Sequence, residues 1–211
     1  MYADVVLPGT VGLGLGALVP LLSRPWCACG RRTSVITALV GAALFVAMAE
    51  RFATWTAVIA YCVLCFGLLV SSTIDIRVHR LPREISYGTM ALGAPWLVWA
   101  TATTGEPWRL RSALVGAGLA LFVMMGLHFL SRGGLGDGDV RFGPLLGMFS
   151  GWLGVPVVVD ALLVGFASGA VWGSTLLIIR RAGRKTAIPF GPFLAWGVIV
   201  AVMLPRRLAW Q

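Results

Sequence analysis

The chain has 211 residues, of which 58% are hydrophobic and only 12% charged, and its mean hydropathy is +0.88. A water-soluble domain carries about 25% charged residues, so this composition excludes an ordinary globular protein and indicates an integral membrane protein. The net charge of +9 comes from short arginine clusters between apolar runs, without a basic face interleaved with aromatic residues. We therefore expect no nucleic-acid partner and interpret the charge as a topology signal in a membrane.

Eight apolar runs follow one another along the chain. A helix needs about 20 residues to cross the hydrocarbon core, and most of the runs are close to this length. They predict an all-α polytopic membrane helix bundle in a single domain, residues 1–211, with about eight transmembrane helices. The sixth run is short and interrupted by glycine, so seven full spans are the alternative. The runs are 5–22, 34–49, 54–74, 85–103, 112–130, 142–153, 155–179 and 189–205.

The first run, 5–22, lacks the basic start and the small-residue cleavage site of a signal peptide, so we expect a retained helix. Cys27 and Cys29 follow it in a loop; they supply only two ligands, whereas structural zinc usually takes four, so we expect no metal there. Cys62 and Cys65 lie inside the third run, where they are expected to pack as small apolar side chains.

Small residues recur every four positions in two of the runs. Gly12 and Gly16 share one face of the first run, and Gly165, Gly169 and Gly173 share one face of the seventh. Such spacing lets two helix backbones approach closely in lipid. We predict that both stripes are packing seams between helices.

The orientation of the bundle follows from its basic residues. If the N-terminus lies outside, twelve of the seventeen Lys and Arg residues fall in internal segments and five in external ones. Cytoplasmic segments are enriched in Lys and Arg. We therefore predict that both termini lie outside.

Two aspartates stand at the same predicted membrane face. Asp75 directly follows the apolar end of the third run. Asp139 stands shortly after the fifth run, sixty-four positions after Asp75. Acids at the membrane edge are costly and usually functional. Two neighbouring carboxylates share a proton, so one can act as base toward water while the other protonates a carbonyl oxygen. We predict that Asp75 and Asp139 form a catalytic pair for aspartic proteolysis.

Three glycines precede the second aspartate: Gly134, Gly136 and Gly138. We expect them to permit positive φ and a close backbone approach of an extended substrate beside Asp139. A flexible turn with two solvated aspartates is the alternative. Asp137 is expected to be a solvated neighbour that tunes Asp139 by like-charge repulsion.

Three other titratable residues have simpler interpretations. Asp160, inside the seventh run, is expected to be a hydrogen-bond partner in helix packing. His79 and His128 lack partners at ligand spacing, so neither predicts a metal site.

The run Gly136-Asp-Gly-Asp139 matches the Gly-x-Gly-Asp signature of membrane aspartic peptidases. The longer run from Gly134 to Arg141, the segment from Asp75 to Pro82, and the segment from Ile188 to Leu194 occur in that order. Together they resemble the type IV prepilin peptidase family over about residues 70–205.

The resemblance implies an aspartic endopeptidase that cleaves the short basic leader from prepilins or pseudopilins at the cytoplasmic face of the bacterial inner membrane. It also implies Asp75 and Asp139 as catalytic residues, no metal or organic cofactor, and membrane lipids as surroundings; it does not give the oligomeric state. The expected support of the catalytic loop is Gly134, Gly136, Gly138 and Arg141. The candidate substrate-binding residues are Arg77, His79, Pro82, Pro189 and Gly191.

The chain departs from the family pattern in three places. Arg83 stands where Asp or Asn is frequent, and Arg141 stands where Lys is usual. Cys27 and Cys29 are the only counterpart of the two Cys-x-x-Cys pairs in the methyltransferase segment of larger relatives. We therefore expect the peptidase-only form found with Flp/Tad-type pili, without methylation of the product.

Three other functions remain as alternatives. An ion-coupled transporter could use intramembrane acids, although the two key acids here lie at one face rather than at mid-bilayer. A presenilin-type protease would carry Pro-Ala-Leu where this chain has Pro189-Phe-Gly-Pro192. A non-catalytic membrane scaffold would not need the paired acids.

Overall fold

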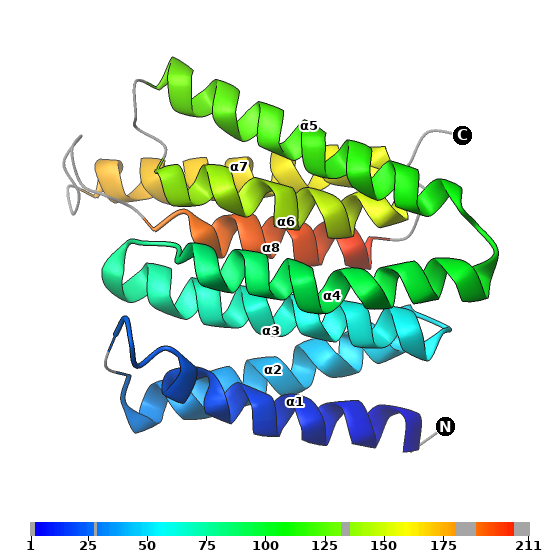
Figure 1. The fold of residues 1–211 in the computed structure, drawn as a ribbon. Helices are drawn as coiled ribbons and strands as arrows, with labels where there is room; N and C mark the ends of the chain where they lie inside the picture. Colours follow the sequence, from blue (N-terminus) through cyan, green and yellow to red (C-terminus); the bar gives the residue numbers. More distant parts are fainter. Residues whose placement is uncertain (1–2, 28, 132–135, 180–188, 205–211) are drawn as a thin grey trace.

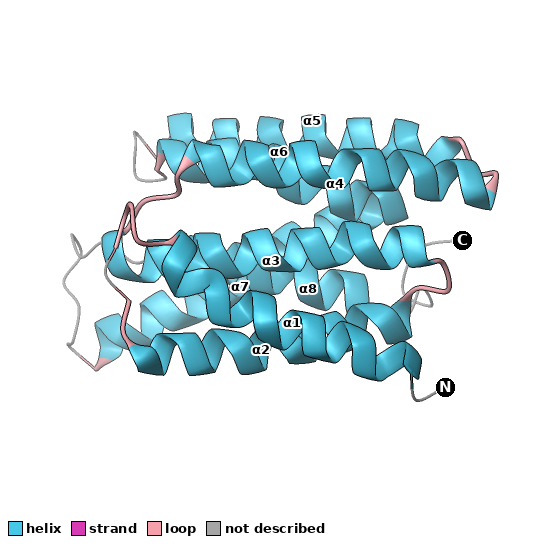
Figure 2. Cartoon of the chain, turned by 60° about the horizontal axis from the view of Figure 1, so that its bottom comes forward, coloured by secondary structure: helices cyan, strands magenta, loops and turns pink. Residues whose placement is uncertain are grey.

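The computed structural model describes residues 3–27, 29–131, 136–179 and 189–204, and within these ranges it is a bundle of α-helices without a strand (Figure 1). Figure 2 shows the helices running along a common direction, with the turns gathered at the two ends. The prediction of an all-α bundle of about eight helices is confirmed. The helices are α1 (Ala3–Leu22), α2 (Arg31–Arg51), α3 (Trp55–Val78), α4 (Arg83–Thr104), α5 (Trp108–Leu130), α6 (Asp137–Leu153), α7 (Val155–Ile178) and α8 (Gly191–Met203).

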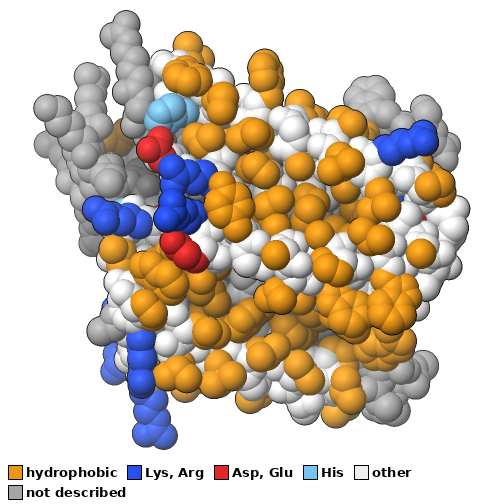
Figure 3. Space-filling model, in the orientation of Figure 1, with side chains coloured by type: hydrophobic (Ala, Val, Ile, Leu, Met, Phe, Trp, Pro, Cys, Tyr) orange, Lys and Arg blue, Asp and Glu red, His pale blue; other side chains and the backbone are white. Residues whose placement is uncertain are grey.

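The surface of the bundle suits a lipid environment. Within the described residues, four helices, α2, α3, α5 and α7, are long and apolar enough to cross a membrane. Large apolar side chains such as Leu92, Leu114 and Phe122 are 67 to 76% exposed. Figure 3 shows apolar side chains covering the middle of the molecule, with charged side chains toward its ends. Because a water-exposed surface would not carry so large an apolar patch, the chain forms a helical membrane bundle.

Two helices extend beyond the apolar runs that predicted them. The helix α3 continues past Ile74 to Val78, and α6 begins at Asp137, five residues before the apolar run at 142–153. Hydropathy marks only the apolar part of a helix, so it does not detect a polar last or first turn. As a result both Asp75 and Asp139 belong to helices, not to loops.

Close backbone contacts join neighbouring helices. A Cβ atom at Gly16 would lie 2.3 Å from the Thr37 carbonyl oxygen of α2, and a Cβ atom at Gly165 would lie 3.3 Å from Leu194 of α8. The predicted seams on α1 and α7 are therefore confirmed at these positions. A third seam joins α5 and α6, where a Cβ atom at Gly147 would lie 2.2 Å from the Gly116 carbonyl oxygen.

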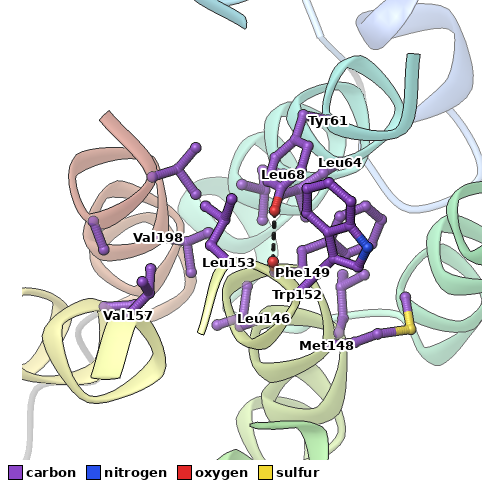
Figure 4. Packing of buried hydrophobic residues seen from close by; sticks show 14 of the residues in the cluster. Tyr61, Leu64, Leu68, Leu146, Met148, Phe149, Trp152, Leu153, Val157 and Val198 are labelled. Atoms are coloured by element: carbon purple, nitrogen blue, oxygen red, sulfur yellow. Dashed lines mark hydrogen bonds between the residues drawn. The ribbon is translucent and has the colours of Figure 1, made fainter. Parts of the chain in front are cut away.

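The buried core ties α3 to α6. Tyr61 of α3 is fully buried and donates its hydroxyl hydrogen to the Phe149 carbonyl oxygen of α6 at 2.7 Å (Figure 4). Trp152, also in α6, packs edge-on against Tyr61 and donates its indole N–H to Thr101 Oγ1 of α4 at 2.8 Å. Buried polar groups with satisfied hydrogen bonds hold helices in one register. This core therefore fixes the relative position of the two helices that carry the aspartates.

Candidate active site

Four helix ends meet at one end of the bundle. There α3 ends, and α4, α6 and α8 begin (Figure 1). Asp75 lies in the last turn of α3, Asp139 in the first turn of α6, and Gly191 is the first residue of α8. The bundle thus brings together residues that are far apart in the sequence.

Asp75 is buried, with 5% of its surface exposed. Its Oδ2 accepts a hydrogen bond from the backbone N–H of Gly191 at 2.8 Å. A Cβ atom at Gly191 would lie 2.9 Å from Asp75 Oδ2 and 3.1 Å from Leu81 Cδ2. Only glycine leaves room for the start of α8 to approach the carboxylate so closely.

The turn after Asp75 packs the site from a second side. The backbone N–H of His79, in the left-handed conformation at φ 54° and ψ 42°, donates to the Asp75 carbonyl oxygen at 2.8 Å and ends α3. The chain then reverses through Leu81 to Pro82, which is the N-cap of α4. Because the Leu81 side chain lies against Gly191 and its backbone lies against Gly138, Leu81 contacts both helices that complete the site.

Asp139 is half-buried in the first turn of α6. Burial, and after it the negative charge of Asp75, raise the pKa of Asp139 to about 7, against a hydrogen bond from the Gly136 backbone that lowers it. That hydrogen bond reaches back to the N-cap residue, as in a capping box. Leu81 contacts both Gly138, next to Asp139, and Gly191, which donates to Asp75, so the two acids belong to one site.

Burial and mutual repulsion oppose the simultaneous ionisation of such a pair. The second ionisation would place two negative charges side by side in a poorly hydrated site, which is unfavourable. The arrangement can therefore offer a carboxylate and a carboxylic acid at the same time, which is the combination that acid–base chemistry on a carbonyl requires.

The predicted conformation of the glycines is wrong for the two that the structure describes, and Gly134 lies outside the described residues. Gly136 has φ −67° and ψ 147°, and Gly138 lies within helix α6, so neither uses positive φ. The close backbone approach is found, but it involves Leu81 of the same chain. A Cβ atom at Gly138 would lie 3.0 Å from Leu81 Cβ. Gly138 is thus explained by packing of the α3–α4 turn on α6.

The candidate substrate-binding residues lie at different distances from the pair. Gly191 contacts Asp75 directly, Pro82 is buried beside Leu81, and Pro189 is half-buried just before α8. Arg77 instead extends toward α2, where its Nη2 donates to Thr33 Oγ1 at 3.0 Å. The side chain of His79 is exposed.

Arg141, expected to support the catalytic loop, is also exposed, on the first turns of α6. It lies two residues after Asp139, so its backbone is held by the same helix start.

The remaining acids face other partners. Asp137 Oδ1 lies 3.7 Å from His128 Nε2 at the end of α5, and its side chain is 76% exposed. Asp137 is thus a solvent-exposed neighbour, as predicted, but it faces α5. Asp160 is partly buried in α7, and no hydrogen bond from another described residue reaches its side chain, so the expected packing bond is not found there.

The cysteine loop forms a close pair. Cys27 and Cys29 place their sulfur atoms 3.4 Å apart, and burial together with this contact raises the pKa of Cys27 to about 11. No group of three or more His, Cys, Asp or Glu side chains suited to a metal occurs within the described ranges.

Sequence reasoning missed the role of Leu81. It also placed Gly191 among substrate-binding candidates rather than as a hydrogen-bond donor to Asp75. The Leu81-Pro82 pair directly after the first aspartate and the glycine at the start of the last run are the signals that pointed to this region. Neither signal says which residue contacts which.

Comparison with known proteins gives a consistent result. Residues 62–174 match the type IV leader peptidase family. The chain is similar to proteins named prepilin leader peptidase/N-methyltransferase. It is 31% identical to that of Stutzerimonas stutzeri over 149 residues, which are 68% of this chain and 49% of the relative. It is 34% identical to that of Pseudomonas aeruginosa over 155 residues, 71% and 50%, and 26% identical to that of Bacillus subtilis over 195 residues, 88% and 75%.

The chain thus spans about half the length of the Stutzerimonas and Pseudomonas relatives. No solved structure matches it. The matched segment, 62–174, contains both Asp75 and Asp139, whereas Gly191 lies beyond it.

Proposed function

This chain belongs to the type IV leader peptidase family, and on that premise we propose that it is a membrane aspartic endopeptidase that removes the short leader from prepilins or pseudopilins. Asp75 and Asp139 are its catalytic pair. The proposed location is the bacterial inner membrane, with the active site at the cytoplasmic face. The substrate class follows the names of the relatives.

The observation that carries the proposal is the meeting of two carboxylates from separate helices. Asp75 lies in the last turn of α3 and Asp139 in the first turn of α6, sixty-four positions apart in the sequence, and Leu81 contacts glycines next to both acids. The charge of Asp75 contributes to the raised pKa of Asp139. A structural role would not require two acids to share a poorly hydrated site, because such an arrangement costs stability. Perturbed pairs of this kind are typical of acid–base catalysis.

The proposed reaction uses one water molecule and the shared proton. Asp75 takes a proton from the water while the water oxygen attacks the carbon of the scissile carbonyl. At the same time Asp139 donates its proton to the carbonyl oxygen. In the second step the C–N bond breaks, the amine nitrogen takes the proton that Asp75 received, and the hydroxyl returns a proton to Asp139. The products are a carboxylic acid and an amine, and the pair regains its single proton.

The hydrogen bond from Gly191 supports this assignment of roles. It occupies Oδ2 of Asp75 and holds the carboxylate in one orientation. Carboxylates accept N–H hydrogen bonds more strongly than neutral carboxyl groups do. We assign the proton of the pair to Asp139, whose pKa is raised to about 7, so that the protonated form prevails below neutral pH.

The proposed cytoplasmic face follows the distribution of basic residues. Of the ten Arg residues that the structure describes, seven lie at the pair's end of the bundle. Positive charge of this kind is retained on the cytoplasmic side during insertion. A leader that remains in the cytoplasm would meet the pair at the membrane boundary.

The first test is co-expression with a prepilin of the same genome, followed by gel analysis of leader removal. We expect the wild type to shorten the substrate, and Asp75→Asn and Asp139→Asn each to leave it uncut while accumulating normally in the membrane. Asp137→Asn is the matched control. It removes an acid from the same helical turn as Asp139, but the Asp137 side chain faces His128 and not the pair.

Three results would count against the proposal. Processing by both catalytic-pair variants would refute the assignment of Asp75 and Asp139. Loss of processing in Asp137→Asn to the same extent would refute the distinction between the two acids of this turn. A wild type that cuts no prepilin would refute the peptidase and favour an ion-coupled transporter.

A further inference from the structure

A large cavity lies at the opposite end of the bundle from the aspartate pair. It has a volume of about 640 Å³ and lies where α2, α4, α6 and α8 end and where α3 and α5 begin. Its lining includes Glu50, Arg51, Thr54, Arg109 and Trp152. This is the size range of small-molecule sites, in a part of the molecule that the proposed peptidase chemistry does not use.

The two arginines of the cavity differ in their partners. Arg109 pairs with Glu106, and its guanidinium lies over the Trp152 ring, 4.5 Å from the centroid. Arg51 donates from Nε to the Val202 carbonyl oxygen at 2.9 Å, and no ion pair in the described part of the chain includes it. Arg51 is therefore a half-buried cation that faces the cavity, and no carboxylate of the residues that the structure describes forms an ion pair with it.

An apolar groove lies beside the cavity, with a smaller space between them. A smaller cavity of about 210 Å³ shares Phe52 and Ala53 with the large one, and it shares Trp55 and Val58 with a third space of about 340 Å³. This third space is lined by apolar side chains of α1, α2, α3 and α4. The charged cavity and the apolar groove thus adjoin one another along α3 through shared lining residues, and together they are called the path.

The groove opens sideways toward the lipid. Four of its lining residues, Leu7, Val11, Trp55 and Leu92, are between 45 and 67% exposed, whereas Phe45 and Val58 form a buried floor. From Trp55 to Phe66 the path covers about 16 Å at 1.5 Å per residue. One leaflet of the hydrocarbon core measures about half of 30 Å. The groove therefore has the length of an acyl chain in a single leaflet.

We propose that this path binds one glycerophospholipid from the leaflet opposite the aspartate pair. The phosphate is held by the guanidinium of Arg51, and one acyl chain lies in the groove between α1 and α3. Guanidinium groups bind phosphate by paired charge-assisted hydrogen bonds. Because Glu50 lines the same cavity, a headgroup that also carries an ammonium, such as phosphatidylethanolamine, suits the site better than an anionic one.

The bound lipid would fasten α1 and α2 to the rest of the bundle. The apolar groove is bordered by α1 and α2 on one side and by α3 and α4 on the other. An acyl chain lying between these helices would contact both sides of the groove, where the protein side chains do not touch one another. The lipid is therefore a structural ligand, and this inference does not depend on the peptidase reaction.

Native mass spectrometry of protein purified in a mild detergent tests the proposal. We expect the wild type to retain one phospholipid, with phosphatidylethanolamine enriched over its share of the membrane. Arg51→Gln should lower retention about tenfold or more, since a charge-assisted contact is lost. Val63→Phe should lower it by filling the groove. The matched control is Arg111→Gln, which removes a charge from the same end without lining the cavity.

A second measurement separates the lipid from free phosphate and from misfolding. After removal of lipid, dioleoyl phosphatidylethanolamine should raise the unfolding temperature of the wild type and of Arg111→Gln but not of Arg51→Gln, and inorganic phosphate should have no effect. All variants must match the wild type in gel filtration and circular dichroism. A wild type without lipid, equal retention by Arg51→Gln and wild type, equal loss in Arg111→Gln, or stabilisation by inorganic phosphate alone would each overturn the proposal.

Discussion

Asp139 occupies a position where two physical effects oppose each other. It lies in the first turn of α6, where the helix dipole and the Gly136 backbone favour a carboxylate. Burial and the neighbouring Asp75 favour the neutral acid. Their combined effect is larger, so the pKa of Asp139 is raised to about 7. The proton that Asp139 carries at neutral pH is therefore held weakly enough to be donated.

This pKa predicts the pH dependence of cleavage. Below pH 7 Asp139 is protonated and can donate; as the pH rises through about 7 the proton is lost. Activity should therefore fall on the alkaline side with a midpoint near 7 and by about tenfold per unit well above it. The measurement is the initial rate of leader removal in detergent from pH 5 to pH 9. Asp137→Asn should keep the same midpoint, and a flat profile from pH 6 to pH 9 would contradict the role of Asp139.

Gly191 is predicted to be intolerant of even a methyl group. In Gly191→Ala the new Cβ atom would meet Asp75 Oδ2 at 2.9 Å and Leu81 Cδ2 at 3.1 Å, so the start of α8 or the carboxylate must shift. A misplacement of a catalytic group by about 1 Å lowers the rate about a hundredfold, so we expect a loss of up to that size. The effect of Gly191→Ala is measured as the rate of leader removal by the purified protein. Gly88→Ala is the control, since a Cβ atom there meets nothing within 4 Å; equal rates for the two variants would refute the proposed constraint.

At the scale of helices, close packing through glycine holds the pairs together. The pairs α1–α2, α5–α6 and α7–α8 each contain a glycine whose backbone touches the neighbouring backbone, such as Gly12, Gly147 and Gly197. Lipid provides no hydrophobic force between helices, so van der Waals contact of this kind supplies much of the attraction. The α5–α6 seam matters most for the site, because it positions the helix that carries Asp139.

Replacement of Gly147 should therefore destabilise the protein. Alanine normally stabilises a helix relative to glycine by about 0.5–1 kcal/mol, but a Cβ atom at Gly147 would lie 2.2 Å from the Gly116 carbonyl oxygen. Overpacking of this sort costs about 1–3 kcal/mol, so Gly147→Ala should lower the apparent unfolding temperature in detergent. Gly118→Ala, on the same helix pair but with open space around it, should not lower it. If Gly147→Ala were as stable as Gly118→Ala, the seam would not be essential.

For the whole molecule, the proposed orientation places the aspartate pair in the cytoplasm. A fusion after His79 then ends at the pair's side of the membrane, and a fusion after Gly105 ends at the opposite side, because α4 lies between them. Green fluorescent protein should fluoresce after His79, and alkaline phosphatase should be active after Gly105. Each reporter at the other position should be inactive, which is the matched control. The reverse pattern would place the pair outside.

The chemistry at one end and the proposed lipid site at the other use different properties of the same bundle. The aspartate pair needs helix ends that approach closely and exclude water, as Gly138 and Gly191 allow. The opposite end leaves a cavity and an open groove between α1 and α3. The core built on Tyr61 and Trp152 connects the two ends.

The sequence by itself determined the helical membrane class, the order of the helices and the segments that meet at one end. These properties are local: an apolar run of about 20 residues predicts a span wherever it occurs, and glycines four apart predict a seam such as that of Gly16. The two aspartates were identified because acids at a membrane edge are rare and because their motifs resemble a known family. None of these inferences needs a contact between distant residues.

Only the tertiary structure decided the contacts within the site. The hydrogen bond from Gly191 to Asp75 joins residues 116 positions apart, and no pattern along the chain specifies it. The structure also places Asp139 in a helix, directs Arg77 toward Thr33, and shows Gly138 packed against Leu81. These features depend on how whole helices pack, since packing sets the distance between side chains that hydropathy and spacing treat separately.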